Sequence, residues 1–242
     1  MAAEAKRLMK NPYYYASMLV REGIAGGSVS GAVQNYADCV KPIIEIIGAT
    51  KWKVAAGLII ILFRDRLLFL ADTTVNINPT AEQVATTAIN AARVAKYFNI
   101  EPRVAMLSYS NFTGKKESPA KMRQAAEIVR QIDPDLIVDG EMQADTAISP
   151  GITERIFPFS KIKNGANILV FPELNSGNIG YKLIQQLSEC QVMGPFLLGI
   201  NKPANVLQRT CKVQDIINSI VLTAVATQAW TKETKKKNVR KK

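Results

Sequence analysis

Short apolar runs alternate along the chain with longer segments that carry apolar residues at helical spacing. The apolar runs predict strands in residues 55–63, 67–71, 104–108, 136–139, 166–171 and 194–200. The helical spacing predicts helices in residues 80–98, 119–132, 178–189 and 213–230, with a turn or short helix over 151–156. Because strands alternate with helices of this length, the pattern predicts an α/β fold in which helices cover mostly parallel sheets on both faces.

Turn and capping signals locate several element ends. Asn11-Pro12 interrupts an amphipathic pattern at the start of the chain, which predicts either one helix or a pair, since proline fits a first helical turn. The charged residues 64–66 join two apolar runs and indicate a β-hairpin. Thr80 and Gln83 match a capping box, so we expect a helix to begin there.

The segment Gly23–Gly31 is rich in glycine, and a helical pattern follows it as far as Ile47. A loop of this kind that opens onto a helix can hold an anion through its backbone N–H groups. The same residues also fit an ordinary strand–loop–helix connection. The sequence leaves both interpretations open.

Polar side chains gather just after the predicted strands. In an open α/β sheet, ligands bind outside the carboxyl ends of the strands, so we expect a site among these residues. They are Asp72-Thr73-Thr74, Ser108–Asn111, Asp139–Glu141, Glu173–Asn178 and Asn201-Lys202.

The composition excludes several classes of function. The 242 residues are 48% hydrophobic and 21% charged, which is typical of a folded globular protein. The chain contains no histidine, which excludes Ser-His-Asp and Cys-His nucleophiles and histidine zinc sites. Its longest apolar stretch, Val54–Phe63, is shorter than the roughly 20 residues that a membrane span needs. The charged start does not resemble a signal peptide, so we expect a cytoplasmic protein with no membrane association.

The charge and the remaining acidic residues suggest no further ligand. The formal net charge is +11, and much of it lies in residues 231–242, which we expect to form a basic flexible tail. The tail contains no aromatic residue, and we expect no nucleic-acid partner. The carboxylate pairs Asp133/Asp135 and Asp139/Glu141 could suggest metal ligands. The first pair flanks a proline in a turn.

Five longer stretches resemble the phosphate acetyltransferase family, in the same order and spacing over about residues 7–230. Several details, such as A-D-T-T-V-N and S-Y-S-N-F, look closer to the phosphotransacetylase-like C-terminal domain of bacterial NADP-dependent malic enzymes. The family's usual leading segment has no counterpart here, so we expect an N-terminally truncated member. The five stretches are Asn11–Gly23, Ala71–Gln83, Phe171–Lys182, Gly194–Pro203 and Leu207–Asn218.

The resemblance implies two α/β subdomains around a cleft, similar to the isocitrate and isopropylmalate dehydrogenase-like fold. Subdomain I would comprise residues 1–56 plus 201–230, with the C-terminal helix returning to it. Subdomain II would comprise residues 57–200. Members of the family are usually homodimers, and we expect the same here.

The resemblance also implies an activity, the reversible transfer of acetyl between coenzyme A and inorganic phosphate. Coenzyme A, acetyl phosphate and phosphate would be substrates. The resemblance implies no bound cofactor and no metal site. Arg209 and Asp215 match the family's arginine, which contacts the substrate oxyanion and phosphate, and the aspartate that acts as base for the thiol. The alternatives are a surface arginine and an aspartate favoured by a helix N-terminus.

Three positions depart from the family pattern. Gln208 stands where the family has a serine that assists the thiolate, and its amide can still donate a hydrogen bond. Lys41 replaces an arginine and provides a point charge without a bidentate grip. Thr73 replaces a cysteine. Gln208 and Lys41 favour the alternative function, a non-catalytic acetyl-CoA-binding regulatory module derived from a malic enzyme. The retained Arg209 and Asp215 favour the enzyme.

Further polar residues are candidates for substrate binding, and each has a structural alternative. The serines and Asn111 could instead cap a strand end, the asparagines near 175 could cap a helix, and the lysine could be solvated. Cys211 lies near Arg209, but we expect it to be a buried packing residue. The candidates are Ser108, Ser110, Asn111, Asn175, Asn178 and Lys202.

Overall fold

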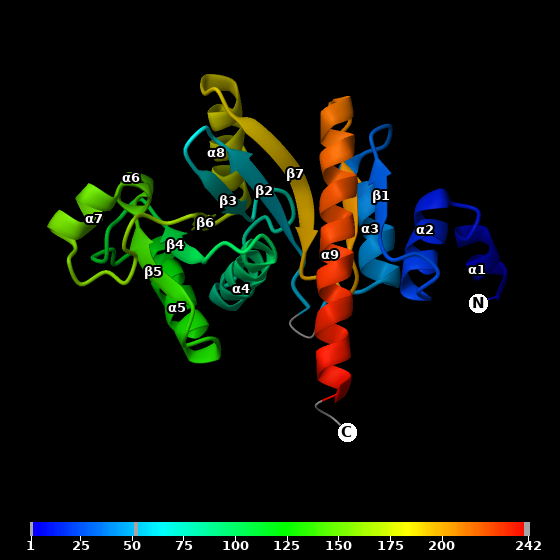
Figure 1. The fold of residues 1–242 in the computed structure, drawn as a ribbon, viewed down its shortest axis with the longest axis horizontal. Helices are drawn as coiled ribbons and strands as arrows, with labels where there is room; N and C mark the ends of the chain where they lie inside the picture. Colours follow the sequence, from blue (N-terminus) through cyan, green and yellow to red (C-terminus); the bar gives the residue numbers. More distant parts are fainter. Residues whose placement is uncertain (1, 51–52, 240–242) are drawn as a thin grey trace. The chain divides into compact units, whose positions relative to one another are not determined.

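The computed structural model describes residues 2–50 and 53–239, and its chain divides into two units (Figure 1). Unit 1 comprises Met1–Ala55 and Gly194–Lys242, and unit 2 comprises Ala56–Met193. The chain therefore leaves unit 1 once and returns to it with its last segment. Among the described residues, no helix combines the length and the apolar character that crossing a membrane requires.

Unit 1 is built around a parallel pair of short strands. β1 pairs with β8 in a register that runs from Ser28 opposite Ala204 to Gly31 opposite Leu207. Helix α9 packs against both strands. The elements are α1 (Ala2–Leu8), α2 (Pro12–Arg21), β1 (Ser28–Gly31), α3 (Tyr36–Ile46), β8 (Ala204–Leu207) and α9 (Val213–Val239).

The structure decides between one helix and a pair of helices at the start of the chain. Two helices are present, and Asn11 is the N-cap of the second, where its side chain accepts a hydrogen bond from the backbone N–H of Tyr13. Pro12 occupies the first turn, where it interrupts no intrahelical hydrogen bond. The structure also contains β1 and β8, which the sequence pattern did not reveal because each strand is only four residues long.

Unit 2 contains most of a sheet with strand order β5-β4-β6-β3-β2-β7. β2 and β3 form the expected antiparallel hairpin, whereas β3–β6, β6–β4 and β4–β5 are parallel pairs. The mostly parallel α/β fold is thus confirmed. The strands are β2 (Ala56–Leu62), β3 (Leu67–Ala71), β4 (Arg103–Leu107), β5 (Ile137–Met142), β6 (Ile168–Val170) and β7 (Gln191–Leu198), which ends in unit 1.

Helices cover both faces of this sheet because successive strand residues point in opposite directions. Leu68 and Leu70 of β3 belong to a buried cluster that includes Tyr181 of α8. The intervening Phe69 faces the other way and contacts Phe98, at the end of α4, with ring centroids 6.3 Å apart. Figure 1 shows α4 and α5 side by side along the sheet. The helices are α4 (Ala81–Tyr97), α5 (Glu117–Ile132), α6 (Ala144–Ile148), α7 (Pro150–Ile156) and α8 (Leu174–Leu187).

Several expected element ends were wrong. β5 continues to Met142, so Asp139 and Glu141 lie within a buried strand and not after it. α8 begins at Leu174, four residues earlier than expected, because Glu173 caps it. α9 continues to Val239, so the segment expected to be a flexible tail is helical up to that residue. The rest of that segment, residues 240–242, lies outside the described residues.

We expect Gly177→Ala to destabilise the protein, since a Cβ atom on this buried glycine of α8 would lie 2.2 Å from the backbone oxygen of Asp72. Overpacking of this kind costs about 1–3 kcal/mol of unfolding free energy. Denaturant unfolding monitored by circular dichroism measures the loss. Gly151→Ala is the matched control, because a Cβ there meets no atom within 4 Å. Equal stability of the two variants would contradict this packing.

Candidate active site

Arg209 lies on a tight turn between β8 and α9. The turn is closed by the backbone N–H of Cys211, which donates to the carbonyl oxygen of Gln208 at 3.2 Å. The Arg209 side chain is exposed. Cys211, expected to be buried, is only partly buried because it belongs to this exposed turn. The turn therefore presents Gln208 and Arg209 directly after the carboxyl end of β8.

Asp215 lies in the first turn of α9 and is half-buried. Its Oδ2 accepts a hydrogen bond of 2.7 Å from the backbone N–H of Lys212, which satisfies one of the free donors at the helix start. This contact corresponds to the helix-terminus alternative for Asp215. A carboxylate has about four acceptor positions, so one such bond leaves it able to accept a proton as well.

The two candidate lysines of unit 1 differ in their surroundings. Lys41 on α3 is exposed, and its Nζ lies 3.9 Å from Oε1 of Glu45. Nζ of Lys202 donates to the carbonyl oxygens of Val20 and Arg21, at 2.9 and 2.8 Å, at the end of α2. It also lies 5.5 Å from the ring centroid of Trp230. Lys202 therefore has a structural contact with a helix C-terminus, where a cation is favoured.

In unit 2, the loop after β4 is held by side-chain hydrogen bonds. Nδ2 of Asn111 donates to Oε1 of Gln143 at 2.7 Å, and Oδ1 of Asn111 accepts from the Gln143 backbone N–H at 2.8 Å. The Ser110 backbone N–H lies 3.4 Å from Oγ of Ser108. The structure thus brings the three candidates of this loop together, and Asn111 fixes its conformation.

The candidates near residue 175 lie inside α8 and do not cap it. Glu173 is the N-cap residue, and its carboxylate accepts hydrogen bonds from the backbone N–H groups of Asn175 and Ser176, both at 2.8 Å. Burial favours the neutral acid, but these bonds and nearby Lys121 outweigh it and lower the pKa of Glu173. Nδ2 of Asn178 donates to the carbonyl oxygen of Thr73 at 3.1 Å.

Of the acidic residues considered as metal ligands, Asp139 and Glu141 are each paired with an arginine. Asp139 accepts from Nη2 of Arg130 at 2.8 Å, and Oε2 of buried Glu141 lies 3.1 Å from Nη1 of Arg123. Among the side chains that the structure describes, no group of three His, Cys, Asp or Glu residues is arranged to hold a metal ion. These carboxylates therefore connect β5 to α5.

Asn35, which no sequence pattern connects with the site, lies beside Arg209 in the structure. Oδ1 of Asn35 accepts a hydrogen bond from Nη2 of Arg209, although the two residues are 174 positions apart. Asn35 is the N-cap residue of α3. An asparagine before a helix is a capping signal, and no local pattern connects it to an arginine so far along the chain.

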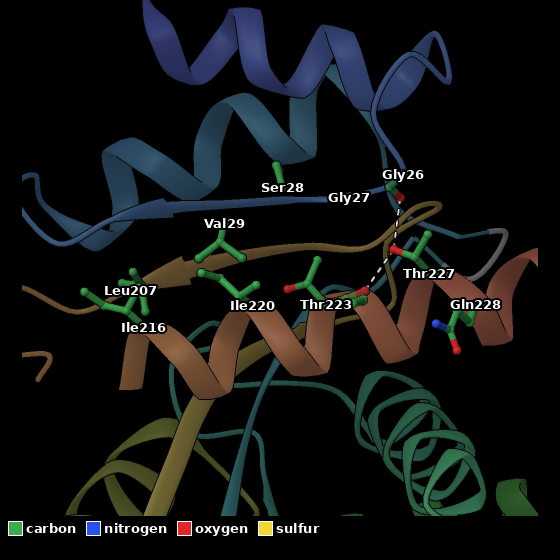
Figure 2. Close-up of a pocket in the computed structure, with 11 residues that line it drawn as sticks. Gly26, Gly27, Ser28, Val29, Leu207, Ile216, Ile220, Thr223, Thr227 and Gln228 are labelled. Carbon is green, nitrogen blue, oxygen red and sulfur yellow. Dashed lines mark hydrogen bonds between the residues drawn. The ribbon is translucent and has the colours of Figure 1, made fainter. Parts of the chain in front are cut away.

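Unit 1 also has an apolar groove with a volume of about 630 Å³ between β1 and α9 (Figure 2). Oγ1 of Thr227 donates to the carbonyl oxygen of Gly26 at one end of it. None of the predicted site residues is among those that line this groove, although one lining residue, Leu207, directly precedes the Gln208–Cys211 turn. The lining residues are Gly26–Val29, Leu207, Ile216, Ile220, Thr223, Ala224, Thr227 and Gln228.

Comparison with known sequences places the chain in a family of acyltransferases. The model of the phosphate acetyl/butaryl transferase family matches residues 1–224, and the chain belongs to this family. It is 40% identical to a phosphate acetyltransferase of Bacillus subtilis over 91% of this chain and 69% of that protein. It is 38% identical to a phosphate acetyltransferase of Nitratidesulfovibrio vulgaris over 93% of this chain but only 32% of that protein.

Solved structures show the same relationship. A phosphotransacetylase from Streptococcus pyogenes superimposes with a TM-score of 0.91 at 38% identity, covering 95% of this chain and 71% of that one. The fold observed here is therefore that of a phosphotransacetylase over nearly the whole chain. The chain spans between 32% and 71% of the length of these relatives.

We expect Glu173→Gln to reduce stability at neutral pH and to change its pH dependence. Because folding lowers the pKa of Glu173, its contribution is present above its unfolded-state pKa and is lost as the pH falls through the folded-state pKa. The variant should lose up to about 1 kcal/mol of unfolding free energy at pH 7 and match the wild type in strong acid. Denaturant unfolding at several pH values measures this. Exposed Glu189→Gln, which caps no helix, is the control.

Proposed function

We propose that this chain catalyses the reversible transfer of an acetyl group between coenzyme A and inorganic phosphate. The observation that carries the proposal is its membership of the phosphate acetyl/butaryl transferase family, with relatives at 38–40% identity over more than 90% of the chain. Coenzyme A, acetyl phosphate and phosphate are then substrates, and the chemistry needs no bound cofactor.

In the direction of thioester formation, Asp215 takes the proton from the coenzyme A thiol. A free thiol has a pKa of about 8.5, so a base is needed to provide the thiolate near neutral pH. The thiolate attacks the carbonyl carbon of acetyl phosphate and forms a tetrahedral oxyanion. When this intermediate collapses, the C–O bond to phosphate breaks and phosphate leaves with the electron pair.

Arg209 stabilises the negative charge on the carbonyl and phosphate oxygens in this step. A guanidinium presents several N–H donors in a planar fork, which suits phosphate geometry. The exposed position of Arg209 on the turn after β8 supports this role. Gln208, its neighbour on the turn, has an amide that can donate a hydrogen bond to the thiolate.

We assign substrate binding to the remaining polar candidates. Exposed Lys41 would attract phosphate as a point charge, and Lys202 would add positive potential. In unit 2, polar residues of the loop after β4 and of helix α8 would also bind substrate. The two units would correspond to the family's two subdomains. The unit 2 candidates are Ser108, Ser110, Asn111, Asn175 and Asn178.

A second candidate function is a non-catalytic acetyl-CoA-binding module, related to the domain fused to bacterial malic enzymes. The observation that favours it is the replacement of family residues by Gln208 and Lys41. The Lys41 ammonium lies near Glu45, which partly offsets its charge. Saturable binding of acetyl-CoA in calorimetry, without turnover, would favour this module over the enzyme.

We expect Arg209→Ala to reduce the rate of thioester formation from acetyl phosphate and coenzyme A on the order of 10²–10³-fold, as for removal of one oxyanion donor. Asp215→Asn should lower it by about 10²–10⁴-fold, because asparagine can still accept the Lys212 hydrogen bond but cannot act as a base. The thioester absorbance measures both rates. Arg64→Ala, on the exposed hairpin turn, is the control and should leave the rate unchanged. Full activity of either site variant would contradict the assigned role.

We also propose that the protein is a cytoplasmic homodimer, as its family resemblance implies. Light scattering coupled to size exclusion should give twice the mass of the 26.6 kDa chain. A mass that stays at one chain over a tenfold range of protein concentration would contradict the dimer.

A further inference from the structure

The loops that follow β1 and β8 begin next to each other in unit 1. The strands are parallel, so both of their carboxyl ends lie at the same edge, with Gly31 opposite Leu207. The backbone N–H of Ala32 extends the pairing by donating to the carbonyl oxygen of Leu207 at 3.3 Å. Asn35 lies four residues beyond the end of β1, and Arg209 lies two residues beyond the end of β8.

The approach of the two strands at this edge requires a glycine. Gly31 has a φ of +101°, and a Cβ atom there would lie 2.4 Å from the carbonyl oxygen of Leu207. An L side chain fits neither the conformation nor the space. The backbone at Gly31 and Leu207 therefore fixes where the two loops begin, and Asn35 can reach Arg209 from a defined direction.

The side chain of Asn35 does not make the hydrogen bond to the helix start that an N-cap asparagine usually makes. Asn35 is the N-cap residue of α3 and has extended backbone. Nδ2 of the amide instead donates to Oδ2 of Asp38 at 3.3 Å, while Oδ1 accepts from Nη2 of Arg209. Because the two ends of the amide differ, the bond to Asp38 turns the oxygen toward the guanidinium.

The partner of Arg209 is neutral. Among the residues that the structure describes, no carboxylate lies within ion-pair distance of Arg209, whereas Arg123 and Arg130 are both paired with acidic residues. A neutral acceptor restricts the rotamers of a long side chain without offsetting its charge. The guanidinium has five N–H donors, and a single bond to Asn35 leaves the others for a phosphate group.

We propose that Asn35 is a positioning residue that orients the guanidinium of Arg209 toward the phosphate group of the substrate while leaving its full positive charge available. This inference rests on the role proposed above for Arg209. Asn35 does not itself touch the substrate; it acts through the arginine, and Asp38 sets the orientation of its amide.

The test is a double-mutant cycle on thioester formation with Asn35→Ala, Arg209→Ala and the double variant. Asn35→Ala should lower kcat/KM for acetyl phosphate roughly 10- to 100-fold, the range expected for loss of one hydrogen bond to a charged group. The KM for coenzyme A should stay unchanged. In the Arg209→Ala background, removing Asn35 should have no further effect, since the interaction it supports is already gone.

Two further variants separate positioning from a general structural effect. Asn35→Asp has the same shape but puts a carboxylate beside the guanidinium, so kcat/KM for acetyl phosphate should fall even though an acceptor remains. Gln34→Ala, at the neighbouring exposed position, should behave as wild type. Thermal melting of Asn35→Ala should match the wild type within about 2 °C, because no capping bond is lost and the two side-chain bonds of Asn35 are exposed to solvent.

The outcomes distinguish this inference from the proposed function. An inactive wild type, or a fully active Arg209→Ala, overturns the assigned chemistry and this inference with it. If Arg209→Ala is impaired but Asn35→Ala is fully active, only the positioning role is overturned. The positioning role would also be overturned if the losses in the cycle were additive. The same holds if Asn35→Ala raised the KM for coenzyme A as much as the KM for acetyl phosphate, or if Asn35→Asp had wild-type activity.

Discussion

Unit 1 is assembled from two parts of the chain that lie far apart in the sequence, and the parallel pairing of β1 with β8 joins them. Each strand has only four residues, so the pair is stabilised mainly by the helices that pack on it, α9 among them. Gly31 permits the close approach at the carboxyl end. The positions of Arg209, Asn35 and the start of α9 all follow from this one pairing.

Arg209 differs from the arginines of α5 in the kind of group that its side chain contacts. In unit 2, Glu141 and Asp139 are buried in β5, and each is paired with an arginine, because an unpaired buried carboxylate would be costly. Those arginines therefore serve to connect α5 to β5. In unit 1, Arg209 remains exposed with an amide as its partner, and its charge stays available. This contrast separates charges that hold the fold from a charge suited to binding an anion.

Much of the fold could be predicted because its signals are local. The capping box at Thr80, the proline after Asn11 and the apolar runs of the β2–β3 hairpin each act within a few residues, and all three features are present. The errors also have local causes. Glu173 is a less common N-cap than Asn178, yet its carboxylate reaches two backbone N–H groups and starts α8 earlier. The four-residue strands of unit 1 are too short to give a periodic pattern.

The sequence by itself determined the α/β class and, through a resemblance that extends along nearly the whole chain, the family and the candidate residues Arg209 and Asp215. Their surroundings were decided only by the tertiary structure. The helix-capping bond of Asp215, the attachment of Lys202 to the end of α2 and the contact between Asn35 and Arg209 all depend on where the backbone places these residues. A hydrogen bond between residues 174 positions apart follows from strand pairing, and periodicity and short motifs report only on neighbours in the chain.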